Sequence, residues 1–382
     1  MTEPVVSIAN LSIDYVVGAG RFRAVSDVSL DIAPGQVVGI VGETGCGKST
    51  LAQAIPRLLP EPPATIGGGS IRFRGIDLVK VPQWKMPLLR GTGISMIFQE
   101  PLNSLNPAYR IFDQVAEAVR IRKVREEGRP APDPREPPPF DYSRGPAPSA
   151  GETLMKPLVP PGTTERLHHR SLVRRPDLYP DVLEYLRLVR INDPETILGL
   201  YPHELSGGMR QRVMIAMALS EKPTLLIADE PTSALDVTIQ AQVLTLMKEL
   251  IEEVHASILF ISHDLGVVAE TADVLGVMYA GRLVEIGPVD QLFEAPEHPY
   301  TKALLAAAPN RYKGDGILRS IRGSVPNLSR PPSGCRFHPR CDLAQAICRG
   351  DPPPLAVRAG VAEAPGVRRS ACYFPEKVGG LP

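Results

Sequence analysis

Residues 42–50, which read Gly-Glu-Thr-Gly-Cys-Gly-Lys-Ser-Thr, constrain the fold of this chain more than any other stretch. The apolar run 37–41 before them predicts a buried strand, and residues 51–55 after them predict the first turn of a helix. A strand, the pattern G-x-x-x-x-G-K-S and a helix in this order predict a phosphate-binding loop. Its glycines let backbone N–H groups point at phosphate oxygens, and the start of the helix adds positive potential.

The same loop supplies two side chains with chemical roles. Lys48 is expected to reach the β- and γ-phosphates of a nucleotide, and the Ser49 hydroxyl is expected to bind Mg²⁺. Taken alone, the motif also fits a Gly-rich strand–helix turn without a ligand. The predicted nucleotide-binding residues are Gly42, Glu43, Thr44, Gly45, Cys46, Gly47, Lys48, Ser49 and Thr50.

Length and composition exclude several classes of protein. The chain has 382 residues, 43% of them hydrophobic, which is enough for two domains with a sizeable core. No apolar run approaches the roughly 18 to 20 residues that span a bilayer, and the N-terminus lacks the basic and apolar regions of a signal peptide. Lys and Arg number 42, as do Asp and Glu, so no net charge attracts nucleic acid. We therefore expect a cytoplasmic protein without a nucleic-acid partner.

Two adjacent carboxylates close a second buried strand, residues 224–230. At the end of a strand beside the phosphate-binding loop, Asp229 is placed to hold the water shell of Mg²⁺. Glu230 is placed to orient or deprotonate a water that attacks the γ-phosphate. Two such charges at the end of an apolar strand are costly without a cation, so a purely structural interpretation is weak.

Two more polar side chains follow predicted strands. Gln99 closes the strand 93–98, and its amide oxygen is a candidate ligand of Mg²⁺ or of the attacking water, although spacing alone favours a structural glutamine. His263 ends the strand 257–262 and is a candidate for contact with the γ-phosphate. A lone histidine is usually structural. The position of His263 at the end of a further strand of the same sheet favours the functional role.

Ser206, Gly207 and Gly208 precede an apolar helix, residues 213–219, and predict a second anion-binding helix start. Two phosphate-binding helix starts in one chain are explained by a dimer, in which the serine end of one subunit closes on the nucleotide of the other. Upstream, the ring of Tyr15 is a candidate to stack on adenine, with Phe22 as its competitor. The alternative is an ordinary half-buried strand tyrosine.

Proline interrupts the chain between residues 123 and 180, including the run 137–139. Because proline breaks helices, this composition predicts a surface insertion rather than a continuous helix.

Together these motifs resemble the nucleotide-binding subunit of an ATP-binding cassette (ABC) transporter. The correspondence is in chain order: Walker A at 42–50, the Q-loop Gln99, the signature 205–209, Walker B at 225–229 with Glu230, the D-loop 233–236 with Asp236, and the switch His263. The resemblance implies an α/β fold, with a RecA-like P-loop core of residues 1–98 and 222–290 and an inserted α-helical subdomain at 99–221. It also implies ATP hydrolysis with Mg²⁺, a second ATPase subunit, and work at the cytoplasmic face of the cell membrane.

A narrower resemblance, to the dipeptide and oligopeptide importer branch, comes from residues 201–204, 237–240 and 298–301. It implies a related, non-identical ATPase partner, two membrane permease subunits and an extracytoplasmic substrate-binding protein. Nickel or another small solute is the alternative cargo. A soluble ABC-type ATPase without a transport role is the remote alternative, and it would not be expected to carry the cysteine-rich tail described next.

The C-terminal region, residues 291–382, carries four cysteines: Cys335, Cys341, Cys348 and Cys372. Their pattern is similar to that of the importer branch, in which four cysteines hold a [4Fe–4S] cluster. Thiolate sulfur is the usual ligand of such clusters. The spacing is not that of a zinc finger, so Zn²⁺, held by the four cysteines or with His338, is the second interpretation. Free thiols in a loop-rich tail are the third.

Overall fold

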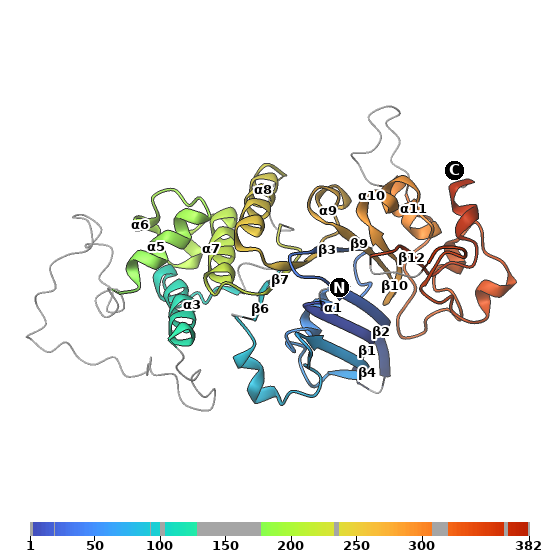
Figure 1. Ribbon diagram of the computed structural model, residues 1–382, viewed down its shortest axis with the longest axis horizontal. Coiled ribbons are helices and arrows are strands. Elements are labelled where there is room, and N and C mark those ends of the chain that lie inside the picture. The colour runs from blue at the N-terminus through green and yellow to red at the C-terminus, as the bar shows by residue number, and fades with distance from the viewer. Residues whose placement is uncertain are drawn as a thin grey trace, which may run out of the picture. The chain divides into compact units, whose positions relative to one another are not determined.

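The computed structural model describes residues 3–18, 20–91, 93–99, 104–127, 177–232, 237–307, 320–362 and 366–380. The chain forms two compact units (Figure 1). We call Met1–Val81, Ile227–Glu230 and His255–Pro382 the core unit, and Pro82–Leu226 with Pro231–Val254 the helical unit. These limits differ from the predicted ranges, since the C-terminal region lies in the core unit and residues 82–98 in the helical unit. In the described part of the chain no helix is long and apolar enough to cross a membrane.

An antiparallel sheet begins the core unit. Its strands lie in the order β2-β1-β4-β5, with the bounds Val6–Val17 for β1, Gly20–Ile32 for β2, Ala64–Phe73 for β4 and Ile76–Asp77 for β5. Strand β1 is a single strand whose register with β2 and β4 shifts along its length. Gly69, at φ +86°, lies where a Cβ would come within 2.5 Å of the Ala9 carbonyl oxygen, so glycine permits this irregular pairing.

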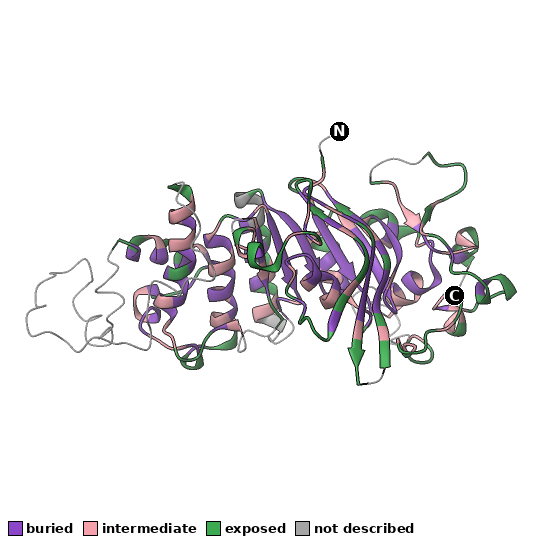
Figure 2. Ribbon diagram, turned by 90° about the horizontal axis from the view of Figure 1, so that it is seen from below, coloured by how far each residue is buried: buried purple, intermediate pink, exposed green. Residues whose placement is uncertain are grey.

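The second sheet of the core unit positions the phosphate-binding loop. Its central strand, β3 (Val37–Val41), is parallel to β8 (Ser257–Ile261) on one side and to β9 (Val274–Tyr279) on the other. All residues of β3 and β8 are buried, as expected for parallel strands covered on both faces (Figure 2). Helix α9 (Leu265–Thr271) packs directly on β3, because a Cβ at Gly39 would lie 2.3 Å from Val268. The carboxyl end of β3 is therefore held firmly where the loop begins.

The rest of this sheet joins the C-terminal region to the core. From β9 the order continues β10-β12-β11, and on the other side of β3 it continues β8-β7. Glu285 of β10 pairs with Ser370 of β12, so the tail adds strands to the nucleotide-binding sheet. The remaining elements of the core unit are α1 (Lys48–Ala54), β7 (Leu225–Asp229), β10 (Arg282–Pro288), α10 (Val289–Glu294), α11 (Pro299–Ala306), η3 (His338–Arg340), η4 (Ala346–Arg349), β11 (Ala356–Val357), β12 (Arg369–Ser370) and η5 (Pro375–Gly380).

The helical unit is built around α7, which contacts α3, α5 and α8. Buried side chains of α3, α5 and α7, among them Phe112, Val182 and Val213, form its core. The elements of this unit are η1 (Gln83–Leu88), β6 (Ile94–Ile97), α3 (Ile111–Glu126), α5 (Tyr179–Leu188), α6 (Pro194–Ile197), η2 (Pro202–Glu204), α7 (Gly207–Ser220) and α8 (Val237–Val254).

The predicted insertion at 123–180 is too wide at both ends. Helix α3 continues to Glu126, and α5 already begins at Tyr179. Ion pairs hold these two ends together: Asp181 of α5 lies 3.2 Å from an Arg122 guanidinium nitrogen and 2.6 Å from Lys123 Nζ. The proline-rich segment itself, residues 128–176, lies outside the described residues.

Candidate functional site

The loop between β3 and α1 has the backbone that its glycines predict. Gly42, Gly45 and Gly47 have φ angles of 155°, 78° and 102°, which L side chains rarely adopt. A Cβ at Gly42 would lie 2.2 Å from the Met278 carbonyl oxygen, and one at Gly47 would lie 2.5 Å from that of Ala24. These two positions therefore require glycine both for conformation and for space.

Lys48 places a positive charge inside this loop. Its side chain is only 4% exposed, and Nζ donates hydrogen bonds to the carbonyl oxygens of Gly42 (2.8 Å) and Glu43 (3.3 Å). Nζ also lies 3.9 Å from Oε1 of Glu230. The ammonium thus stands between the loop and the carboxyl end of β7, where the phosphates of a nucleotide would bind.

The two predicted Mg²⁺ ligands of the core unit are neighbours. Ser49 Oγ donates a hydrogen bond of 3.0 Å to Asp229 Oδ1 at the end of β7. Burial raises the pKa of Asp229 to about 6, against the lowering effect of the Ser49 hydrogen bond. A divalent cation would favour the charged carboxylate, and Mg²⁺ bound to a nucleotide keeps several waters and takes only one or two protein ligands. The pair therefore fits a Mg²⁺ site completed by phosphate and water.

The raised pKa of Asp229 gives a stability prediction for the nucleotide-free protein. Because the folded protein holds this proton up to about pH 6 and the unfolded chain only to about pH 4, stability falls as the pH rises between these values. Asp229→Asn removes the buried charge, so we expect it to stabilise the protein by about 2 kcal/mol at pH 8, and by much less at pH 4. Urea unfolding at both pH values in magnesium-free buffer measures this. An equal gain at both would contradict the prediction.

Glu230 and His263 form a second pair of interacting side chains in the site. Glu230 Oε2 lies 3.2 Å from His263 Nδ1; the glutamate side chain is 13% exposed and the imidazole 60%. The backbone of Glu230 has φ 46°, and its N–H donates a hydrogen bond of 2.9 Å to the Ile261 carbonyl oxygen of β8. A glutamate in the left-handed region is strained, and such strain concentrates at functional sites. No local sequence pattern predicts this conformation of Glu230, whose Oε1 lies 3.9 Å from Lys48 Nζ.

Several other predicted site residues belong to the helical unit or lie outside the described residues. Gln99 is exposed just after β6. Ser206 is the N-cap of α7, where its Oγ accepts a hydrogen bond of 3.3 Å from the Met209 N–H. Gly208 packs closely against α8, since a Cβ at this position would lie 2.6 Å from the Ile239 side chain. The approach of Gln99, Ser206, Gly207 and Gly208 to a nucleotide remains a prediction, and Asp236 lies outside the described residues.

Tyr15 and Phe22 are cross-strand partners on β1 and β2. Their rings stack with centroids 5.4 Å apart and planes inclined by 10°. Tyr15 is half-buried against Phe22, and its contact with adenine remains a prediction.

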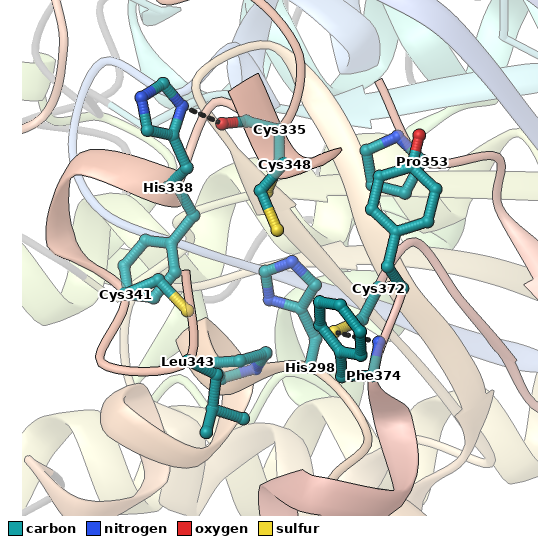
Figure 3. A pocket seen from close by; sticks show the side chains of 12 residues that line it. His298, Cys335, His338, Cys341, Leu343, Cys348, Pro353, Cys372 and Phe374 are labelled. Carbon is teal, nitrogen blue, oxygen red and sulfur yellow. Dashed lines mark hydrogen bonds between the residues drawn. The ribbon is translucent and has the colours of Figure 1, made fainter. Parts of the chain in front are cut away.

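The four cysteines of the C-terminal region line one pocket (Figure 3). Burial raises the pKa of Cys341 to about 11 and that of Cys372 to about 12, so both are neutral thiols at pH 7. His298, also neutral because burial lowers its pKa to about 3, lies among them. Nowhere in the described residues do three His, Cys, Asp or Glu side chains form a group that could hold a metal ion. This finding supports neither the cluster interpretation nor the zinc interpretation.

A glycine-rich loop with a buried lysine, a serine beside a strand-end aspartate, and a following glutamate define a P-loop nucleotide-hydrolysing protein. Comparison with known proteins then places the chain within this class. Residues 25–233 match the ABC transporter family, and residues 284–348 match the C-terminal region of oligopeptide and dipeptide transporters. The chain belongs to the ABC transporter family and is its ATPase component.

Similar proteins cover almost the whole chain. A probable peptide ABC transporter ATP-binding protein of Sinorhizobium fredii is 44% identical over 87% of this chain and 86% of its own length. The dipeptide transport ATP-binding protein DppD of Bacillus subtilis is 40% identical, over 91% and 89%. A putative peptide import ATP-binding protein of Brucella abortus is 39% identical, over 94% of each.

Solved structures confirm the predicted α/β cassette fold. The ABC cassette MJ0796, solved as a dimer with ADP and Pi, matches with a TM-score of 0.54 at 22% identity. The match covers 74% of this chain and 98% of that one.

Proposed function

We propose that this chain is the ATP-hydrolysing subunit of an importer of dipeptides or oligopeptides. Peptides are proposed as the cargo because residues 284–348 match the C-terminal region of oligopeptide and dipeptide transporters. Relatives named as peptide transport proteins, which are similar along nearly the full chain, support the same cargo. The partners that we infer are a related, non-identical ATPase subunit, two membrane permease subunits and an extracytoplasmic substrate-binding protein. The place of work is the cytoplasmic face of the membrane.

The geometry of the core unit supports a division of roles in ATP hydrolysis. Lys48 would contact the β- and γ-phosphates, while Ser49 and Asp229 would hold Mg²⁺. Glu230 would position the attacking water, and His263, 3.2 Å from it, would contact the γ-phosphate. In this proposal Gln99 contacts the Mg²⁺ or the attacking water, and Ser206, Gly207 and Gly208 of the partner ATPase contact the same γ-phosphate.

Peptide uptake tests the cargo. Cells that carry the complete transporter with this chain should take up a labelled dipeptide or oligopeptide, and cells with the Glu230→Gln variant should not. Loss of uptake in the variant supports a peptide importer. Unchanged peptide uptake in the variant, with ATP hydrolysis by the purified wild-type protein, would contradict it, and nickel uptake would then be measured.

We further propose that the cysteine pocket holds a [4Fe–4S] cluster. All four thiols line one pocket, although they are separated by up to 37 residues in sequence. In such a cluster each thiolate binds a different iron, which suits four cysteines spread around a pocket better than a single ion does. The residues that would hold it are Cys335, Cys341, Cys348 and Cys372, and its chemistry there would be structural or redox.

Removal of one thiol tests the cluster. Protein purified without oxygen should contain about four irons and four acid-labile sulfides per chain, with visible absorption, and Cys348→Ser should lose most of both. Cys46→Ser, which changes the cysteine of the phosphate-binding loop, is the matched control and should keep the iron. Wild-type protein that contains zinc or no metal would refute the cluster.

A further inference from the structure

The C-terminal region contacts the phosphate-binding loop through an ion pair between two distant residues. Arg340 Nη1 lies 2.8 Å from Oε2 of Glu43, and Nη2 lies 3.2 Å from Oε1. Two parallel bonds between a guanidinium and a carboxylate are the strong, directional form of this interaction. The Arg340 side chain is only 5% exposed, so water screens the pair little.

Arg340 is held in place from its own region as well as by Glu43. Its Nε donates a hydrogen bond of 2.7 Å to the Arg322 carbonyl oxygen. Its guanidinium lies 5.7 Å from the ring centroid of Tyr279 and 5.8 Å from that of Phe337. The guanidinium is therefore held in one position, and there it binds the Glu43 carboxylate.

The backbone of Glu43 has a second anchor from the C-terminal side. Its N–H donates a hydrogen bond of 2.9 Å to the hydroxyl oxygen of Tyr300, a fully buried residue of α11. The Tyr300 ring lies 4.5 Å from the ring of Tyr279, which also contacts Arg340. Both the main chain and the side chain of the second residue of the loop are thus fixed by residues outside the loop.

Charge gives this anchor a role in nucleotide binding. The Glu43 carboxylate projects from the loop that must receive the negative phosphates, and the Glu43 carbonyl oxygen accepts a hydrogen bond from Lys48. A carboxylate without a partner there would repel the nucleotide. We propose that Arg340 is a positioning residue for ATP binding: it neutralises Glu43 and, together with Tyr300, holds the loop in its binding conformation.

The position of Arg340 in the chain links this role to the cysteine pocket. Arg340 directly precedes Cys341, within a turn in which the His338 N–H donates to the Cys335 carbonyl oxygen (3.0 Å) and the Cys341 N–H to that of His338 (3.3 Å). The residue that binds Glu43 therefore lies next in the chain to a cysteine of the pocket.

Binding of a fluorescent ATP analogue to the purified protein tests the proposal. Arg340→Gln should weaken binding about tenfold. Adding Glu43→Gln to this variant should restore binding to within about threefold of the wild type, because the unpaired charge is then gone. The matched control is Arg322→Gln, whose side chain is 87% exposed and whose pair with Asp342 spans 3.7 Å; it should bind normally.

Two outcomes would overturn the proposal. The first is unchanged binding by Arg340→Gln. The second is a double variant as weak as Arg340→Gln, which would mean that the arginine only stabilises the fold. If Arg340→Gln does not fold, Arg340→Lys takes its place: it keeps the charge but loses the two-pronged bond, so a threefold loss, again relieved by Glu43→Gln, is expected.

Discussion

Glu230→Gln is expected to lower kcat for ATP hydrolysis by at least about 100-fold while ATP still binds. The carboxylate lies at the end of β7, 3.2 Å from His263 Nδ1 and 3.9 Å from Lys48 Nζ. A glutamine side chain has nearly the same shape and keeps a hydrogen bond to His263, but it cannot accept a proton from water. The loss should therefore fall on kcat and leave ATP affinity within a few fold of the wild type.

Phosphate release measures kcat, and equilibrium binding of labelled ATP measures affinity. Glu249→Gln is the matched control, because Glu249 is half exposed on α8 and pairs with Arg190 at the surface. It should hydrolyse ATP at the wild-type rate. Rapid turnover by Glu230→Gln would remove Glu230 from the catalytic role and leave His263 or Gln99 as the residue that positions the water.

The sequence predicted which side chains of the core unit lie together, because each is adjacent to a strong local pattern. Strands that are buried along their whole length are continuous apolar runs, so β3, β7 and β8 were predicted within a residue or two of their bounds. Asp229 and His263 follow such runs directly. The loop needs its glycines for local backbone reasons, and these leave a fixed spacing in the sequence.

Long-range contacts left no such pattern. Arg340 and Glu43 are 297 residues apart, and Tyr300 and Glu43 are 257 apart. Arginine and tyrosine in a loop-rich tail predict nothing about a loop near the N-terminus, since only the folded sheet brings them together. The ends of α3 and α5 were missed for a related reason: the Asp181 ion pairs with Arg122 and Lys123 extend helices that proline composition alone would end.

Lys48→Ala is expected to weaken ATP binding by at least about 100-fold. The ammonium is nearly buried and donates hydrogen bonds to the Gly42 and Glu43 carbonyl oxygens, so in the free protein it is already aimed along the loop. A nucleotide would bring several negative oxygens to this nearly buried charge. Lys48→Arg should lose nearly as much, because a planar guanidinium does not fit the space of a compact ammonium.

The same substitution should also lower the stability of the nucleotide-free protein, unlike Asp229→Asn. Removal of Lys48 leaves Glu230 without its nearby cation in a largely buried site, whereas Asp229→Asn removes a buried negative charge. Urea unfolding and ATP binding are therefore measured together, with Lys80→Ala as the control, since Lys80 is exposed and pairs only with Asp77. ATP affinity within threefold of the wild type in Lys48→Ala would contradict the proposed phosphate contact. We expect Lys48→Ala to lower stability and to lose ATP binding, and Asp229→Asn to raise stability. This combination would show that the buried Asp229 carboxylate, which would hold Mg²⁺, destabilises the nucleotide-free protein.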